Sequence, residues 1–305
     1  MSPDAARKTE VSSEATTANF GGMGIYVDGR TANELGELLK TKPAADVTAR
    51  DLYNMSCMHY LEDEPMQRAA EFFELGDTGF ASGAAGSSPH TILDFGSGFA
   101  GDARLIAADY PRCKVTCVEL QPHIHAAAEH FTAMVGLQQC CVHECVDITH
   151  TAPNGGAPFD HLFSVLAILH VGAERSKLWG ALAAAVKPGG SVYIEDYYAA
   201  APLSARDTEQ LAGVVACPYL PSKEEYLATL QQAGFVDVQW EVMNDRWLPF
   251  IATREERFRG AAERNTAVHG AALTAELGLF YSTVLELFTR GNLGGVRIRA
   301  RKAAA

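Results

Sequence analysis

The segment LDFGSGFAG (residues 93–101) begins within a short apolar run, Thr91–Phe95, and leads into a predicted helix that starts at Gly101. The glycines at residues 96 and 98 let the backbone turn tightly and approach a bound molecule closely. Backbone N–H groups at the start of the following helix face such a molecule. The segment therefore predicts a strand, a glycine-rich turn and a helix, with a ligand at the carboxyl end of the strand.

Apolar runs alternate with helical patterns along the rest of the chain. Further strands are predicted at Lys114–Leu120, Cys140–Ile148, Phe159–Leu166, Ser191–Asp196 and Phe235–Val242, and helices at Gly101–Asp109, Pro122 to about Val135, Ala173–Val186 and Lys223–Ala233. This alternation is typical of a parallel sheet covered on both faces. The expected fold is a doubly wound, mostly parallel α/β sheet. Val296–Arg301 (VRIRAR) alternates in polarity and predicts a half-buried edge strand.

The pattern divides the chain into five parts. We expect a flexible tail at 1–20, an N-terminal helical lid at 21–81, a ligand-binding core at 82–243, a helical insertion at 244–293, and a final strand and tail at 294–305. The break between lid and core is SGAAGSSP (residues 82–89), which is rich in turn formers. The insertion is too long for a simple connection and is therefore expected to cover a site.

Charge and composition limit the class of partner. The net charge is -12 and no dense Lys/Arg run occurs, which disfavours nucleic acid as a partner. No apolar run approaches the roughly 18 to 20 residues of a membrane helix, and the N-terminal residues lack the charged-then-apolar pattern of a signal peptide. Seven scattered cysteines indicate reduced thiols in a cytoplasmic protein. A small molecule is the expected partner, and a homodimer is left open.

Acidic residues follow the first three strands of the core. Asp94 lies two residues before the first glycine, Glu119 ends the second strand and Asp147 follows the third. The loop also satisfies G-x-G-x-x-G, and with Glu119 it meets the pattern of an NAD site. Asp94 favours a ligand with an ammonium group near the loop, which NAD lacks and the methionine part of S-adenosylmethionine (SAM) has.

The strand, D-x-G-x-G loop, Glu-ended strand, Asp-ended strand and KPGG turn (residues 187–190) together resemble the class I SAM-dependent methyltransferases over most of residues 91–301. The resemblance implies a Rossmann-like seven-stranded sheet with SAM as cofactor. It implies contacts to methionine, ribose and adenine from Asp94, Phe95, Gly96, Ser97, Gly98, Glu119, Leu120, Gln121, Asp147, Ile148 and Ser164. Ala100 departs from the family, in which many members have glycine.

Three further segments are similar to the sarcosine, dimethylglycine and phosphoethanolamine N-methyltransferases. They are SVLAILH (164–170), IED (194–196) and GNLGG (291–295). The resemblance implies methyl transfer to a small amine; O-, S- or C-methylation is the alternative. Leu166 departs from the family, which often has an acidic residue there. An NAD-binding oxidoreductase and a non-catalytic SAM-binding protein are the alternatives of another class.

Residues at the strand ends are candidates for the acceptor side. His170 and Asp196 are the candidate catalytic residues, and the candidate substrate contacts are His59, Tyr60, Tyr197 and Arg246. Each also has a structural interpretation: loop ordering for His170, helix capping for Asp196, core packing for the tyrosines and a solvated helix face for Arg246. Cys141, His143 and Cys145 alternate along one strand, without the spacing typical of a metal site, so no metal is expected.

Overall fold

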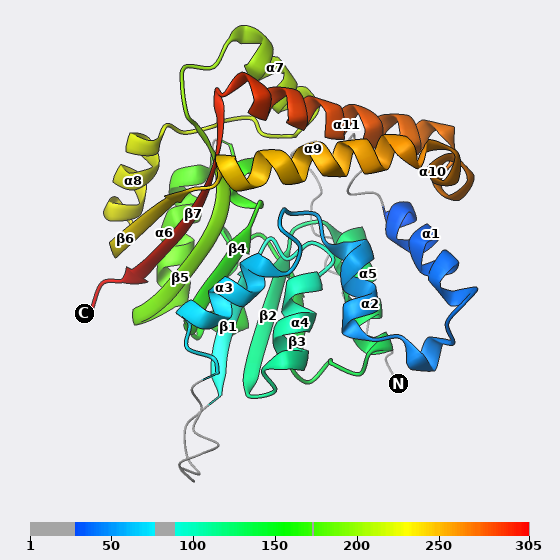
Figure 1. Ribbon diagram of the computed structural model, residues 1–305. Coiled ribbons are helices and arrows are strands. Elements are labelled where there is room, and N and C mark those ends of the chain that lie inside the picture. Colours follow the sequence, from blue (N-terminus) through cyan, green and yellow to red (C-terminus); the bar gives the residue numbers. More distant parts are fainter. Residues whose placement is uncertain (1–27, 77–88, 173, 305) are drawn as a thin grey trace, which may run out of the picture.

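The computed structural model describes residues 28–76, 89–172 and 174–304. The predicted tail at 1–20 and all but the last residue of the 82–89 break lie outside the described residues. One seven-stranded sheet, in the order β3-β2-β1-β4-β5-β7-β6, forms the centre of the molecule (Figure 1). Its strands are β1 His90–Phe95, β2 Cys113–Glu119, β3 Cys141–Cys145, β4 Phe159–Val165, β5 Val186–Ala199, β6 Phe235–Val242 and β7 Leu293–Lys302.

Strands β1 to β5 are parallel, and β7 is antiparallel to both neighbours, β5 and β6. The predicted doubly wound, mostly parallel sheet is therefore confirmed. The carboxyl ends of the parallel strands meet at one edge of this sheet, where ligands bind in such folds.

The prediction that the last strand is an edge strand is wrong. Strand β7 lies between β5 and β6, and β6 forms the edge. The alternation of arginine with apolar residues suggested exposure on one face. Arg297 is instead 3% exposed, because its Nε donates to Glu195 Oε1 at 2.7 Å. Alternation of arginine with apolar residues therefore fits a strand with buried ion pairs as well as a strand with one solvated face.

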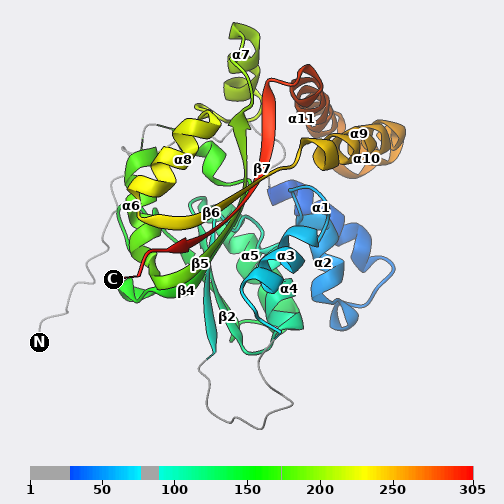
Figure 2. The same cartoon turned by 60° about the vertical axis from the view of Figure 1, so that its left-hand side comes forward.

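Helices cover both faces of the sheet (Figure 2). The helices are α1 Asp28–Leu39, α2 Ala49–Ser56, α3 Glu64–Phe72, α4 Gly101–Asp109, α5 Pro122–Met134, α6 Arg175–Ala185, α7 Ala205–Gly213, α8 Lys223–Gln232, α9 Asn244–Gly260, α10 Ala262–His269 and α11 Ala271–Arg290, with 3₁₀ turns at Ala44–Asp46, Asn154–Gly156 and Ile168–His170. One face buries α3 and α4, through Met66, Ala69 and Ile106, and the other buries α6 and α8, through Trp179 and Leu230.

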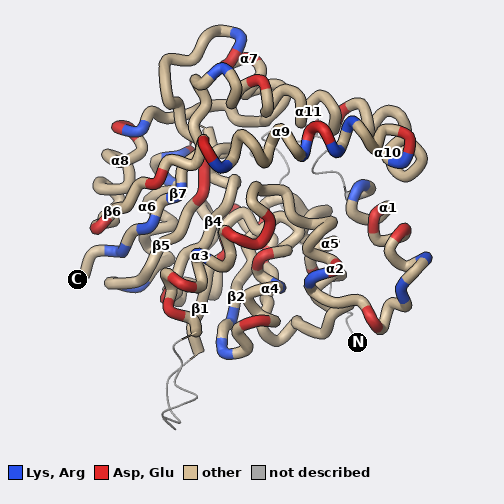
Figure 3. Tube along the Cα trace, in the orientation of Figure 1, with Lys and Arg blue, Asp and Glu red and all other residues tan. Residues whose placement is uncertain are grey.

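The insertion lies over the carboxyl edge of the sheet, whereas α3 of the lid packs on one face. Helices α9 and α11 pack together and cross above the strands, and α1 lies beside α10 (Figure 1). Helix α2 begins with a capping box in which Thr48 accepts from Asp51 N and the Asp51 side chain accepts from Thr48 N. Figure 3 shows acidic and basic segments interspersed along the described chain.

Helix α11 has an apolar composition that the sequence interpretation overlooked. Among the described residues it is the one helix with the length and composition of a membrane span, at 20 residues and a mean hydropathy of 1.3. Its buried residues include Leu277, Val284, Leu287 and Phe288, which pack in the insertion and against the sheet.

Candidate functional site

Two adjoining cavities open at the carboxyl edge of the sheet. The rim cavity lies at the ends of β2 and β3 and is lined by Glu119, Leu120, Asp147 and Ile148, among others. The lid cavity lies under residues 56–60. Both are lined by Gly96, Gly98, Leu166 and His170, so the glycine turn and the segment after β4 join them.

The glycine turn has the geometry that its sequence predicts. Gly96 adopts φ of 68° and Gly98 φ of 53°, in the left-handed region that favours glycine. A Cβ on Gly96 would lie 2.2 Å from Ala167 Cβ, so the turn packs directly on the segment after β4. Ala100, the departure from the family, also adopts a left-handed φ of 56° just before α4.

Glu119 is anchored in the rim cavity. Its Oε2 accepts from Gly98 N at 3.1 Å and its Oε1 accepts from Gln121 N at 2.8 Å. Burial raises the pKa of this carboxyl, although the three backbone hydrogen bonds that it accepts oppose the shift. Each carboxylate oxygen has a further lone pair, so Glu119 is able to accept from a pair of ligand hydroxyls.

Apolar and polar groups are separated in the rim cavity. Leu120, which is 40% exposed, and Ile148 form an apolar part of the cavity wall. Asp147 Oδ1 accepts from Thr149 N at 2.9 Å and from Thr149 Oγ1 at 2.7 Å. Burial of Asp147 would raise its pKa, but the hydrogen bonds from Thr149 and His150 outweigh burial and lower it. The cavity therefore has the surfaces that a flat base with a polar edge requires.

Asp94 brings a buried carboxyl to the lid cavity. It is 4% exposed, and the described residues provide no hydrogen bond to its side chain. Burial raises its pKa well above the usual value, and the nearby Asp102 carboxylate adds to the effect. A cationic ligand group beside Asp94 would favour its ionised form.

The lid contributes a buried ion pair to the same cavity. His59 Nε2 lies 2.7 Å from Asp102 Oδ2, and His59 Nδ1 lies 3.1 Å from the Tyr60 carbonyl oxygen. A carbonyl and a carboxylate only accept, so both ring nitrogens donate and the imidazole is protonated. Burial would lower the pKa of His59, but Asp102 outweighs it and raises this pKa well above the usual value.

Sequence reasoning missed Asp102. The signal was its place on the first turn of the helix after the glycine turn, which brings its carboxylate to the cavity. Its partner His59 was predicted as a substrate contact in the lid, without a partner in the core. The pair joins α4 of the core to the lid, and Arg254 of α9 supports the lid from above by donating to the carbonyl oxygens of Met58 and His59.

We expect the stability of the protein to fall in alkaline solution as His59 loses its proton. The folded-state pKa of His59 is raised, so its contribution is complete below its unfolded value of about 6.5 and is lost as pH rises through the folded value. Urea unfolding between pH 6 and 10 would measure this fall. Asp102→Asn should be less stable at pH 6 and should lack the fall; parallel profiles for the two proteins would refute the ion pair.

His170 lies where the two cavities meet. Its Nδ1 lies 2.9 Å from the Ala216 carbonyl oxygen and therefore donates to it. Burial lowers the pKa of His170 to about 4, so the ring is neutral near pH 7 and its Nε2 carries a lone pair. Tyr60 also lines the lid cavity.

Four predicted site residues lie elsewhere. Asp196 is fully buried, where its Oδ2 accepts from Tyr226 Oη at 2.8 Å and Arg175 pairs with it at 3.4 Å. Side chains alternate along a strand, so Asp196 points to the α6 and α8 face rather than to the cavity. The others are Ser164, which donates to the Phe95 carbonyl oxygen, Tyr197, which packs on Tyr60 and Trp247, and Arg246, which pairs with Glu64.

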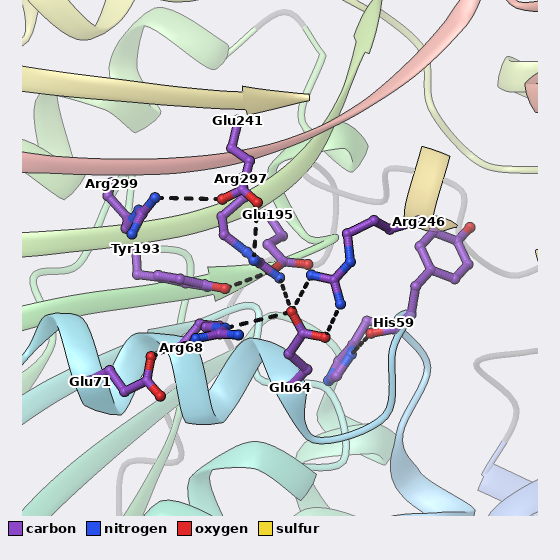
Figure 4. Close-up of polar contacts among 11 residues, drawn as sticks. His59, Glu64, Arg68, Glu71, Tyr193, Glu195, Glu241, Arg246, Arg297 and Arg299 are labelled. Carbon is purple, nitrogen blue, oxygen red and sulfur yellow. Dashed lines mark hydrogen bonds and ion pairs between the residues drawn. The ribbon is translucent and has the colours of Figure 1, made fainter. Parts of the chain in front are cut away.

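The Arg246 contact belongs to an ion-pair network between lid, insertion and sheet (Figure 4). Glu64 of α3 pairs with Arg246 of α9 and, at 3.1 Å, with Arg297 of β7. Arg297 in turn pairs with Glu195 of β5, whose Oε1 also accepts from Tyr193 Oη at 2.6 Å. The sequence interpretation assigned Arg246 to a substrate, whereas here it fastens the insertion to the lid.

Comparison with known proteins agrees with this geometry. Residues 92–190 match the family model described as "Methyltransferase domain". The glycine/sarcosine/dimethylglycine N-methyltransferase of Actinopolyspora halophila is 26% identical over 191 residues, which are 59% of this chain and 33% of that protein. This chain thus spans about a third of the length of that curated relative.

Solved structures share the fold. A phosphoethanolamine N-methyltransferase of Haemonchus contortus, in complex with phosphomonomethylethanolamine and S-adenosylhomocysteine, superposes with a TM-score of 0.69 at 21% identity, covering 91% of this chain and 60% of that one. A putative sarcosine dimethylglycine methyltransferase from Galdieria sulphuraria has a TM-score of 0.65 at 15% identity, covering 90% and 99%. Residues 92–190 thus match a methyltransferase domain, and the chain shares its fold with these solved methyltransferase structures.

Proposed function

We propose that the protein binds SAM across the two cavities and transfers its methyl group to the nitrogen of a small amine. The observation that carries the proposal is the pair of joined cavities with a buried carboxyl at each end, Glu119 in the rim cavity and Asp94 in the lid cavity. Glu119 accepts from the ribose hydroxyls, Asp147 and Ile148 receive the adenine, and Asp94 receives the ammonium of the methionine part.

This arrangement favours SAM over NAD. The dinucleotide would place its anionic pyrophosphate at the glycine turn, beside the buried Asp94 and Asp102. An anionic pyrophosphate would repel the Asp102 carboxylate and disfavour ionisation of Asp94, whereas the ammonium of SAM favours ionised Asp94. The charge of the cavity therefore matches the methyl donor.

Methyl transfer requires alignment more than covalent help from the protein. The nitrogen lone pair attacks the methyl carbon in line with the carbon–sulfur bond, and sulfur leaves as a neutral thioether. His170 lies between the cavities, at the place where the methyl group would pass. With a pKa of about 4 it is a weak base, so the amine must enter in its neutral form, with His170 orienting it.

Incubation with methyl-labelled SAM and a panel of amines, hydroxyl compounds and thiols tests the proposal. We expect label in one or more amines and an equal yield of S-adenosylhomocysteine. Sarcosine and dimethylglycine belong in the panel because the curated relative is named for them. Label in a hydroxyl compound or thiol alone would replace N-methylation by another transfer, and binding of SAM without any transfer would indicate a non-catalytic protein.

Glu119→Gln should weaken binding of S-adenosylhomocysteine by roughly 10- to 100-fold, because hydrogen bonds to a charged group contribute about 1.5–3 kcal/mol. The matched control is Glu129→Gln on α5, where the side chain is 55% exposed. Calorimetric titration of both variants measures the difference. Equal affinity in the two would remove Glu119 from the ribose site.

A further inference from the structure

The lid cavity has one acidic side and one apolar side. Asp94 and Asp102 form the acidic side, next to the glycine turn. The apolar side comes from segments far apart in the chain, namely Met58 of the lid, Leu166 and Leu169 after β4, Val215 after α7 and Phe280 of α11. Leu166 stands where the related N-methyltransferases often have an acidic residue, so this chain has an apolar side chain at the junction of the cavities.

No Lys or Arg side chain lines the lid cavity within the described residues 28–76, 89–172 and 174–304. His59 is the cation there, and it pairs with Asp102. The insertion arginines nearest the lid are occupied elsewhere: Arg254 donates to lid carbonyl oxygens and Arg246 pairs with Glu64. A carboxylate or phosphate on the acceptor would therefore be desolvated beside carboxylates without a counter-ion from these residues.

Acceptor capacity remains on the acidic side. Asp102 is 9% exposed, and its Oδ1 is buried without a hydrogen-bond partner among the described residues. Asp94, on the same side of the cavity, is 4% exposed. SAM has a single ammonium group, which the proposed function assigns to Asp94. Asp102 Oδ1 can then accept from a second N–H donor, which an amine acceptor supplies.

We propose that the methyl acceptor is an amine with an apolar body and no acidic group, whose N–H donates to Asp102 while its carbon skeleton packs on Leu166, Val215 and Phe280. This inference rests on the proposed function. The neutral nitrogen donates its lone pair to the methyl carbon, the carbon–sulfur bond breaks and sulfur keeps the bonding pair. The product ammonium forms beside Asp102, which stabilises the positive charge, and its extra proton leaves to solvent.

Matched acceptors that differ by one carboxylate test the inference. N-methylphenethylamine and N-methylphenylalanine share a carbon skeleton, and sarcosine adds a small amino acid. With the full chain and methyl-labelled SAM, we expect kcat/KM to be roughly 100-fold higher for N-methylphenethylamine than for N-methylphenylalanine. The carboxylate of N-methylphenylalanine would be buried next to carboxylates of the protein, which is strongly unfavourable. A preference for N-methylphenylalanine or sarcosine would overturn the inference and leave N-methylation intact. Transfer to no amine, with SAM bound, would overturn the proposed function itself.

A cation placed on the apolar side should reduce this discrimination. Phe280→Arg is expected to lower the ratio of kcat/KM for the two acceptors by at least about tenfold, because the guanidinium pairs with the carboxylate. Leu279→Arg is the control, since Leu279 is 57% exposed on the same helix. Thermal stabilisation by S-adenosylhomocysteine shows that each variant is folded. An unchanged ratio in a folded Phe280→Arg protein would contradict the placement of the acceptor.

Discussion

Gly96→Ala is expected to weaken binding of S-adenosylhomocysteine by at least about 100-fold, since a displacement of about 1 Å at a site has effects of this size. Gly96 has φ of 68°, where an alanine costs roughly 1–2 kcal/mol. The new Cβ would also lie 2.2 Å from Ala167 Cβ, so the turn or the segment after β4 must move. Both line the cavities that we assign to the cofactor.

The control for backbone strain is Gly136→Ala. Gly136 has φ of 71° and nothing within 4 Å of a built Cβ, so it bears a similar strain without a clash. Gly136 lies two residues after the end of α5 and lines neither cavity. We expect this variant to lose stability but to keep its affinity in a calorimetric titration. Retained affinity in Gly96→Ala would show that the turn does not hold the ligand.

Arg297→Met is expected to lower the free energy of unfolding by about 3–5 kcal/mol, the usual effect of removing one partner from a buried ion pair. Arg297 is 3% exposed, and without it the carboxylate of Glu195, 1% exposed, keeps only the Tyr193 hydroxyl. Glu195 Oε2 already lacks a hydrogen-bond partner among the described residues. Urea unfolding of the variant and the parent protein measures the loss.

The loss should depend on pH. Burial already raises the pKa of Glu195, and Arg297 opposes the shift, so its removal raises this pKa further. A protonated Glu195 is cheaper to bury, so the destabilisation is smallest in acid and grows as pH rises through the folded-state pKa of Glu195 in the parent protein, which already lies above the usual value.

Arg299→Met on the same strand is the control for Arg297→Met. The Arg299 side chain is 36% exposed and pairs with Glu241 at 3.5 Å, so its loss should cost about 0–1 kcal/mol. Similar losses for the two variants would contradict the buried network in Figure 4.

The cofactor half of the site was more predictable from sequence than the acceptor half. Asp94, Gly96 and Glu119 follow from local patterns, because each lies at the end of an apolar run whose direction the fold determines. The structure brings them to two joined cavities. Ser164 was assigned to the same cleft, but its hydroxyl faces the β1 backbone instead.

The acceptor half depends on contacts between distant segments, which local patterns do not encode. His59 meets Asp102 across 43 positions of the chain, and Arg254 reaches the lid across 195. Asp196 illustrates the opposite error: it was expected at a strand end, but β5 continues to Ala199 and the alternation of side chains turns Asp196 toward the other face. The arginines of β7 likewise suggested a solvent-exposed face, although Arg297 is buried in an ion pair with Glu195 of the neighbouring strand.

A calorimetric titration of the full chain with S-adenosylhomocysteine, and separately with NAD, tests the central claim most directly. We predict saturable heat with one site per chain for S-adenosylhomocysteine and none for NAD, because the joined cavities present carboxyls to a cationic nucleoside and to its demethylated product. Absence of binding by S-adenosylhomocysteine and SAM, or saturable binding of NAD in their place, would contradict the assignment of the cleft.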